Sequence, residues 1–123
     1  MDWNEFLAMC RAPVVVLVGG PMTGKTRFFK HMTQGVYSFP TMHIKCSLGK
    51  GGILFVDTPG ERNYRKKDYS WDDVFVNADV IVNFGDWSPS EIPGLRPLYE
   101  PKYLTWSGDD EETMGRILEV FNK

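Results

Sequence analysis

Several features that mark particular protein classes are scarce in this sequence. Its 123 residues include two cysteines, Cys10 and Cys46, which lie too far apart to indicate a disulfide framework or a cysteine metal site, so a reducing compartment is expected. The longest apolar run, Val14–Val18, is too short to span a bilayer. Fourteen Lys and Arg against sixteen Asp and Glu give a net charge of −2, which gives nucleic-acid binding no support. The N-terminus lacks the layout of a signal peptide, and we expect a cytoplasmic protein without a transmembrane segment.

The apolar residues that are present predict a mostly parallel sheet. Continuous apolar runs are typical of strands buried on both faces, and they occur at 14–18, 53–56 and 80–82, with a fourth candidate at 103–106. Residues 42–48 instead alternate between apolar and polar, which predicts a half-exposed edge strand. The glycines between this strand and 53–56 predict a hairpin that joins the two.

Helices are expected between these strands. The helical spacing of apolar residues occurs at 2–11, 25–34 and 109–121, and a looser helix is expected around 70–77. Gly35 is the expected C-cap of the second helix. Four prolines between 85 and 101 indicate a loop. Strands that alternate with helices predict one α/β domain over 1–123, with an N-terminal helix inside 1–12 and helices on both faces of the sheet.

The turn between the first strand and the second helix fits the pattern G-x-x-x-x-G-K-[ST]. Its residues are Gly19, Gly20, Pro21, Met22, Thr23, Gly24, Lys25 and Thr26, and Arg27 follows. In such a loop the backbone amides and the helix N-terminus point at phosphates. The lysine places a charge beside the β- and γ-phosphates, and the threonine hydroxyl ligates Mg²⁺. We therefore expect a nucleotide-binding P-loop.

A second motif, Asp57-Thr58-Pro59-Gly60, directly follows the strand at 53–56. A carboxylate at the end of a buried strand is a usual second anchor for Mg²⁺, generally through water. The amide of Gly60 is in a position to donate to a γ-phosphate. An ordinary ATPase needs the aspartate but has no need of a glycine three residues later.

Together these two motifs resemble the Ras-like GTPase superfamily. The segments 24–29, 35–37 and 57–62 look most like the Arf branch and the β subunit of the signal recognition particle receptor, and the resemblance spans roughly residues 13–85. It implies a three-layer P-loop NTPase fold with strand order 2-3-1-4-5. In that order, strand 2 is the segment 42–48, antiparallel at the edge of the sheet.

The resemblance also implies a function, which is a Mg²⁺-dependent switch that binds GTP and GDP. Thr41 stands where the family has a threonine that binds Mg²⁺ and the γ-phosphate; alternatively, it merely begins the strand. Segments 36–41 and 58–70 are expected to respond to the γ-phosphate and to contact a protein effector or activating partner. Glu61 replaces the glutamine that positions the attacking water, so we expect slow hydrolysis, no faster than roughly 10⁻⁴ s⁻¹. The basic residues after Glu61 supply either a cis arginine finger or a solvated patch.

Recognition of the base is left open by the sequence, which lacks the family motif Asn-Lys-x-Asp. Asn83–Asp86 has the right ends but comes one strand too early. Trp106–Asp109 follows the next strand and would place Asp109 at the base; alternatively, 105–108 matches a later loop of the family and the guanine-reading strand is missing. Trp106 either packs in the protein or stacks on the base. ATP binding, phosphotransfer to a small acceptor and a non-hydrolysing interaction module therefore remain as alternatives.

Overall fold

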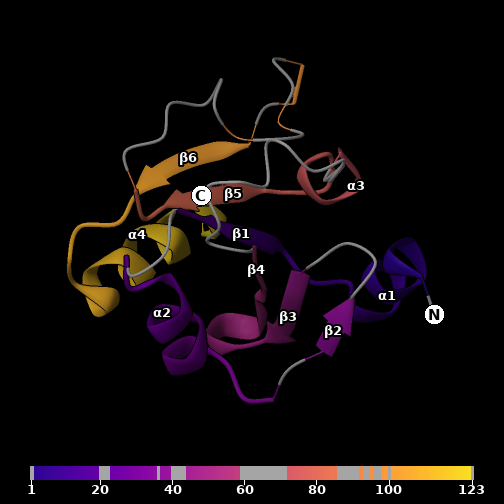
Figure 1. The fold of residues 1–123 in the computed structure, drawn as a ribbon, viewed down its shortest axis with the longest axis horizontal. Helices are drawn as coiled ribbons and strands as arrows, with labels where there is room; N and C mark the ends of the chain where they lie inside the picture. The colour runs from indigo at the N-terminus through magenta and orange to yellow at the C-terminus, as the bar shows by residue number, and fades with distance from the viewer. Residues whose placement is uncertain are drawn as a thin grey trace.

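The computed structural model describes residues 2–19, 23–35, 37–39, 44–58, 72–85, 92, 95, 98–99 and 101–122. These residues form a six-stranded sheet with helices on both faces (Figure 1). The strands are β1 Val14–Val18, β2 Tyr37–Phe39, β3 Ile44–Leu48, β4 Leu54–Asp57, β5 Val80–Asn83 and β6 Lys102–Thr105. The helices are α1 Trp3–Cys10, α2 Lys25–Met32, α3 Asp72–Phe75 and α4 Asp110–Phe121, with a 3-10 turn η2 at Lys50–Gly52.

The sheet has the order β2-β3-β4-β1-β5-β6. β4, β1, β5 and β6 run parallel, and β3 is antiparallel to both β2 and β4. The five strands expected from the sequence thus follow the predicted order 2-3-1-4-5, with strand 2 antiparallel. This part of the fold prediction, a three-layer α/β arrangement with that strand order, is confirmed.

The prediction that the strand at 42–48 lies at the edge of the sheet is wrong. β2, which was not expected, pairs with the outer side of β3 in the register Tyr37↔Cys46. The alternating pattern of β3 has another cause: Ile44 and Cys46 face one apolar cluster, whereas the exposed Lys45 faces the other side. On that other side Ser47 is buried, and its hydroxyl donates to the Gln34 carbonyl at 3.0 Å, so a polar position of the pattern does not mark an exposed edge.

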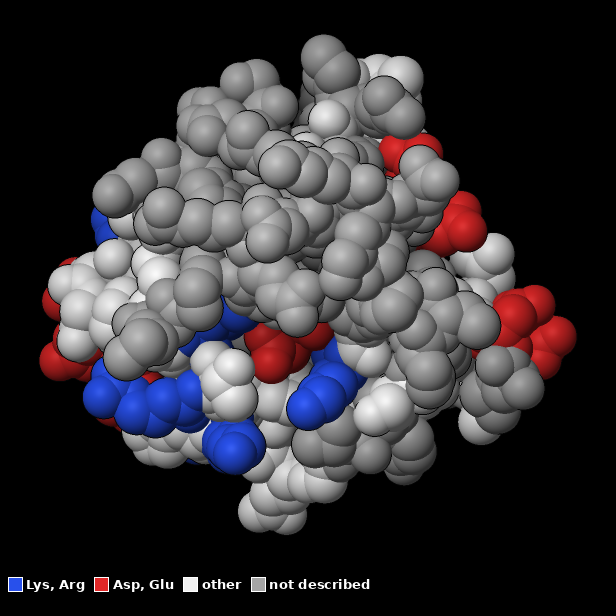
Figure 2. All heavy atoms as spheres, in the orientation of Figure 1, with Lys and Arg blue, Asp and Glu red and all other residues white. Residues whose placement is uncertain are grey.

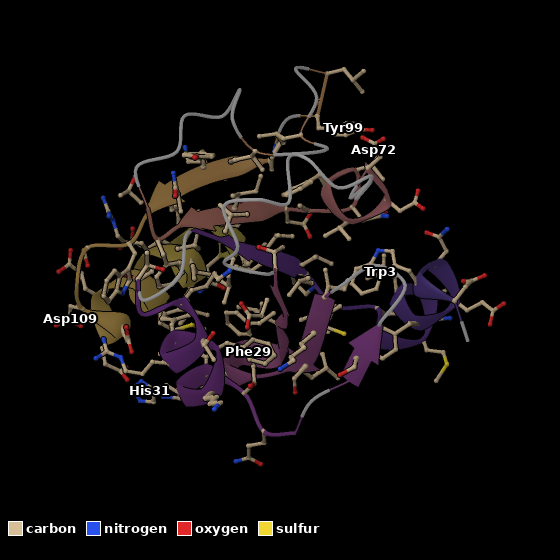
Figure 3. All side chains as sticks on the ribbon, in the orientation of Figure 1. Trp3, Phe29, His31, Asp72, Tyr99 and Asp109 are labelled. Carbon is tan, nitrogen blue, oxygen red and sulfur yellow. The ribbon has the colours of Figure 1, made fainter. Side chains whose placement is uncertain are left out.

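Two apolar clusters hold the three layers together. On one face of the sheet, Trp3 and Phe6 of α1 and Val74 and Phe75 of α3 pack on alternate residues of the strands. On the other face, α2 and α4 pack through Phe28, Phe29, Met32, Met114 and Ile117. Figure 3 shows Phe29 pointing from α2 toward the sheet, whereas His31 points away from it. The five consecutive apolar residues of β1 are buried because this central strand is covered on both faces.

The expected helices are present, but the end of α2 differs from the prediction. The helix ends at Met32, and Thr33 is the C-cap, with its hydroxyl donating to the Phe29 carbonyl at 2.6 Å. Gly35 has φ +81° but lies two residues beyond the cap. The helix thus ends two residues earlier than the predicted range 25–34, where the hydroxyl of Thr33 competes for a backbone carbonyl. Within the described residues, no helix has both the length and the apolar character that crossing a membrane requires.

Candidate nucleotide-binding site

The candidate site lies at the edge of the sheet where the parallel strands β1 and β4 end. Gly19 follows β1, Asp57 ends β4, and Lys25 begins α2. β3 runs antiparallel to β4, and the pair Lys45↔Asp57 shows that β3 begins at this same edge. Six predicted site residues lie outside the described part of the chain: Gly20, Pro21, Met22, Thr41, Gly60 and Glu61.

Both described glycines of the P-loop motif are required by close contacts. Gly19 has φ +154°, and a Cβ there would lie 2.9 Å from the Cβ of Phe84, just after β5. Gly24 has φ +93°, and a Cβ there would lie 3.1 Å from the indole of Trp106. A larger residue at either position would push the loop away from the ends of β5 and β6.

Lys25 lies inside the site rather than in solvent. Its side chain is 4% exposed, and Nζ donates to the carbonyl oxygens of Gly19, at 3.3 Å, and Thr58. Thr58 is itself held in place, since its hydroxyl donates to the Leu17 carbonyl at 2.7 Å. Burial lowers the pKa of Lys25 to about 8, and the carboxylate of Asp57 offsets only part of this effect. The ammonium is thus positioned by the ends of β1 and β4.

Asp57 faces this ammonium with its hydrogen bonding incomplete. Its Oδ1 lies 3.8 Å from Lys25 Nζ, too far for a hydrogen bond, and this buried oxygen accepts none from the described residues. Burial raises the pKa of Asp57, and the charges of Lys25 and Lys45 offset part of the rise. A buried oxygen without a donor is costly unless a ligand completes its shell.

These residues fit a hard cation at the expected place. Oxygen atoms are the ligands that Mg²⁺ prefers, and it usually retains several waters. The orphaned Oδ1 of Asp57 supplies one contact, directly or through water, and Thr26 is exposed in the first turn of α2 next to Lys25. No group of three or more His, Cys, Asp or Glu side chains suited to a metal occurs among the described residues.

The residues discussed for base recognition have structural partners. Asn83 Nδ2 donates to the Tyr103 hydroxyl at 2.7 Å, and its Oδ1 accepts from the Gly85 amide at 2.9 Å, so its amide group links β5 to β6. Asp109 is the N-cap of α4, with Oδ1 accepting from the Glu112 amide at 3.0 Å. One of its two carboxylate oxygens thus already accepts a backbone hydrogen bond. The assignment of Asp109 to the base stays a prediction.

The sequence interpretation missed two contributors to the site. The carbonyl of Thr58 accepts a hydrogen bond from Lys25, and the spacing of Asp57–Gly60 could have suggested this contact because the motif follows a strand beside β1. Trp106 packs against Gly24, but these residues are far apart in sequence and no local pattern links them.

His31 and Arg27, on the exposed side of α2, both contact Asp110 of α4. Figure 2 shows Lys and Arg side chains gathered over α2, with acidic side chains beside them.

Comparisons with known proteins leave the family unassigned. A scan against models of protein families finds no match, and neither does a search of curated proteins. Among solved structures, the chain is similar to an NFeoB variant from S. thermophilus in a crystal structure bound to mGDP, with 28% identity and a TM-score of 0.46. That match covers 61% of this chain and 34% of the other, so this chain spans about a third of that protein's length. The resemblance to the Arf branch therefore stays a prediction.

The lowered pKa of Lys25 predicts how stability depends on pH. Between pH 8 and the ordinary lysine value of 10.5, the unfolded chain holds the Lys25 proton and the folded chain releases it. The free energy of unfolding of the nucleotide-free protein should therefore gain up to roughly 3 kcal/mol from this group as pH rises through that window. Urea unfolding at pH 7.5 and pH 10 measures the change, and Lys25→Met gives the background from other groups. An equal pH dependence in both proteins would contradict the prediction.

Proposed function

We propose that this chain binds a nucleoside triphosphate with Mg²⁺, prefers the guanine nucleotide, and hydrolyses GTP slowly to GDP and phosphate as a switch. The observation that carries the proposal is the buried pair of Lys25 and Asp57, 3.8 Å apart, at the end of the P-loop motif. Burial disfavours the charged form of both groups. A phosphate beside Lys25 and a cation beside Asp57 would compensate both charges, which is why such a ligand pair suits this site.

Each part of the proposed ligand has its own residues. The phosphates lie against the loop Gly19–Thr26, where amides at the N-terminus of α2 and the Lys25 ammonium stabilise negative charge. Thr26 and Asp57 hold Mg²⁺, with Thr41 joining them in the triphosphate state. When bound, Mg²⁺ would neutralise part of the negative charge of the phosphates. The carbonyl oxygens of Gly19 and Thr58 keep the Lys25 ammonium at the phosphates rather than in solvent.

The preference for guanine rests on the resemblance to Ras-like GTPases and on Asp109, which follows the strand next to β5. Recognition by a carboxylate discriminates strongly when it pairs with two donors of the base, because the wrong base leaves polar groups unpaired. ATP is the competing ligand, because the sequence lacks the motif Asn-Lys-x-Asp and Asp109 already accepts one hydrogen bond from the Glu112 amide. Guanine would present two hydrogen-bond donors to Asp109 and adenine would not, so a binding competition between GTP and ATP tests this role.

Hydrolysis is proposed to be slow because Glu61 stands where a glutamine would orient the attacking water. A carboxylate accepts a proton from water but repels the phosphate and donates no hydrogen bond. The Gly60 amide donates to the γ-phosphate, and segments 36–41 and 58–70 change their conformation when the γ-phosphate is lost. These segments contact a protein effector or an activating partner. The proposed location of the protein is the cytoplasm. A chain that retains nucleotide without turnover would be an interaction module instead.

Purified protein loaded with labelled nucleotide tests the proposal. We expect chromatography of the denatured protein to show bound GTP or GDP, and unlabelled GTP to displace the label at concentrations at least tenfold lower than ATP does. Removing Mg²⁺ with a chelator should weaken binding. In a single turnover with GTP and Mg²⁺, we expect a rate of roughly 10⁻⁴ s⁻¹ or less.

Three results would revise the proposal in different ways. Equal displacement by ATP and GTP would overturn the guanine preference but leave the phosphate site. A rate near 1 s⁻¹ without a partner would contradict the assignment of Glu61 as a poor substitute for glutamine. Absence of any nucleotide binding would overturn the proposed function as a whole.

A further inference from the structure

We propose that Trp106 is a positioning residue for the phosphate loop, and that Asp110 in the first turn of α4 locks the indole in place. The inference rests on the proposed function only for its ligand. It means that the backbone of Gly24, where α2 begins, depends on a contact with the residues that follow β6 and begin α4. No sequence motif assigns this role to Trp106.

The contact is at the residue where the loop becomes a helix. Gly24 is the N-cap of α2 and directly precedes Lys25. A Cβ on Gly24 would lie 3.1 Å from Cη2 of Trp106 and 3.5 Å from two further ring atoms. The indole therefore lies against the backbone of Gly24, which has φ +93°. Glycine is the most freely rotating residue, so a rigid ring against it removes conformations that the loop would otherwise sample.

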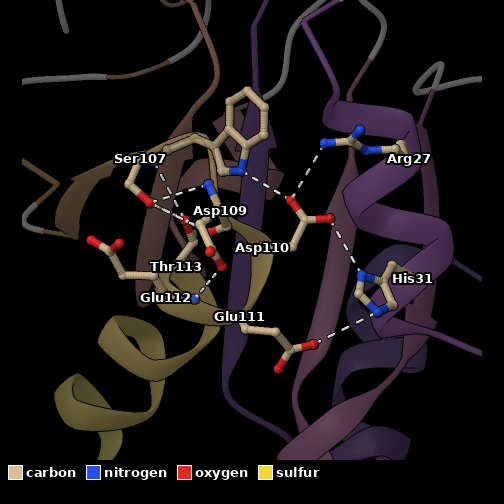
Figure 4. Close-up of polar contacts among 9 residues, drawn as sticks. Arg27, His31, Ser107, Asp109, Asp110, Glu111, Glu112 and Thr113 are labelled. Carbon is tan, nitrogen blue, oxygen red and sulfur yellow. Dashed lines mark hydrogen bonds and ion pairs between the residues drawn. The ribbon is translucent and has the colours of Figure 1, made fainter.

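The indole is itself held by several neighbours. Phe84, just after β5, stacks on it with ring centroids 5.2 Å apart and an angle of 28° between the planes. The guanidinium of Arg27 lies over the ring, 5.9 Å from its centroid. The indole Nε1 donates to Asp110 Oδ1 at 3.0 Å, as Figure 4 shows. With two packed neighbours and a directional hydrogen bond, the ring has little freedom to rotate away from the loop.

Asp110 connects this indole to the exposed side of α2. Besides the hydrogen bond from Trp106, Oδ1 lies 4.0 Å from Arg27 and Oδ2 lies 3.3 Å from His31 Nδ1 (Figure 4). The Asp110 side chain is only 11% exposed, although it belongs to the first turn of a surface helix. A second link runs from His31 to Glu111 at 3.6 Å, and Lys50 lies 3.6 Å from the same carboxylate. The first turn of α4 is thus attached to α2 through Asp110 and Glu111.

This arrangement favours ligand binding by ordering the loop in advance. A loop that is already ordered loses less conformational freedom when phosphates bind to it, so its affinity is higher than that of a loose loop with the same contacts. Removing the indole should leave Lys25 and Asp57 in the protein but allow Gly24 to move. The expected consequence is weaker nucleotide binding without the loss of any group that touches the phosphates.

The test compares two tryptophans whose indole Nε1 atoms both donate a hydrogen bond but which pack on opposite faces of the sheet. Trp3 is 4% exposed, and its Nε1 donates to the Asp73 carbonyl at 3.1 Å, but it packs in the cluster of α1 and α3, away from the loop. We expect Trp106→Leu to weaken binding of GTP with Mg²⁺ about tenfold and Trp106→Phe about threefold, while Trp3→Leu stays within about twofold of the wild type. Asp110→Ala, which keeps the indole and removes its anchor, should also weaken binding about threefold and serves if the leucine variants do not fold.

Amide hydrogen exchange of residues 19–26 in the nucleotide-free protein gives a readout that does not depend on the ligand. Exchange there should be faster in Trp106→Leu than in the wild type and unchanged in Trp3→Leu. The proposed role of Trp106 would be overturned if the two leucine variants changed affinity and exchange equally. It would also be overturned if Trp106→Leu and Asp110→Ala both bound nucleotide within about twofold of the wild type. Faster exchange in Trp106→Leu alone, in a protein that binds no nucleotide, would support that role and reject the proposed function.

Discussion

Lys25→Met is expected to weaken nucleotide binding by about two to three orders of magnitude, because losing one partner of a buried charge contact costs several kcal/mol. The methionine has nearly the same length and keeps the apolar stem of the side chain, but it removes the ammonium that Gly19 and Thr58 hold in position. Isothermal titration with GTP and Mg²⁺, or retention of labelled nucleotide during gel filtration, measures the loss.

The matched control is Lys30→Met on the same helix. Lys30 is exposed, in contrast to the 4% exposure of Lys25, so the change removes one positive charge without altering the site. We expect its affinity to stay within about twofold of the wild type, since exposed charges act weakly at physiological salt. Unfolding in urea must show that Lys25→Met is folded, because the variant removes the buried ammonium next to Asp57 and leaves only the exposed Lys45 as a nearby positive charge. Equal affinities of the two folded variants would remove the basis of the proposed phosphate site.

Gly49→Ala is expected to lower the free energy of unfolding by about 3 kcal/mol or more, a large part of the stability of a domain of this size. Gly49 lies in the hairpin between β3 and β4, where a Cβ would overlap the carbonyl oxygen of Met32 at the end of α2 and lie 3.0 Å from the ring of Phe55. The backbone at Gly49, with φ −136°, is accessible to alanine, so the whole effect comes from the collision between α2 and the hairpin. Urea unfolding followed by circular dichroism measures it.

Gly52→Ala in the same hairpin separates collision from backbone strain. Gly52 has φ +71°, and a Cβ there would have no atom within 4 Å, so alanine should cost only about 1–2 kcal/mol. If both variants lose the same stability, the close approach of α2 to the hairpin does not contribute, and the packing of this end of the sheet would have to be reconsidered.

Much of the fold could be predicted because its signals are local. The five apolar residues of β1 predict a strand without reference to any distant segment, because burial on both faces requires a continuous apolar run. The glycines before Lys25 likewise predict a tight turn from their own conformational freedom. The short strand β2 was missed because it has only three residues, a serine between two aromatic residues, and so short a segment has almost no periodic signal. Its pairing depends on β3, which offers an open edge only once the sheet has formed.

The candidate site divides in a similar way. The sequence pattern singled out Lys25 and Asp57, and the structure brings them to 3.8 Å from each other because both follow parallel strands at one edge. The pattern offered Trp106 as a packing residue or a base platform, and its contact with Gly24 came only from the structure. The base-recognition question stays where the sequence left it, except that Asp109 now has a capping partner.

Apolar periodicity and the spacing of residue types by themselves predicted the α/β class and the positions of most strands, and the resemblance to Ras-like GTPases supplied the order of the predicted strands. The phosphate-binding chemistry of the loop 19–26 stays a prediction from its residue types. The tertiary structure alone decided that β3 lies inside the sheet, that Lys25 and Asp57 are buried together, and that Trp106 lies against Gly24. Each of these facts is a contact between segments far apart in the chain. Such contacts depend on how whole elements pack, which no short stretch of residues encodes.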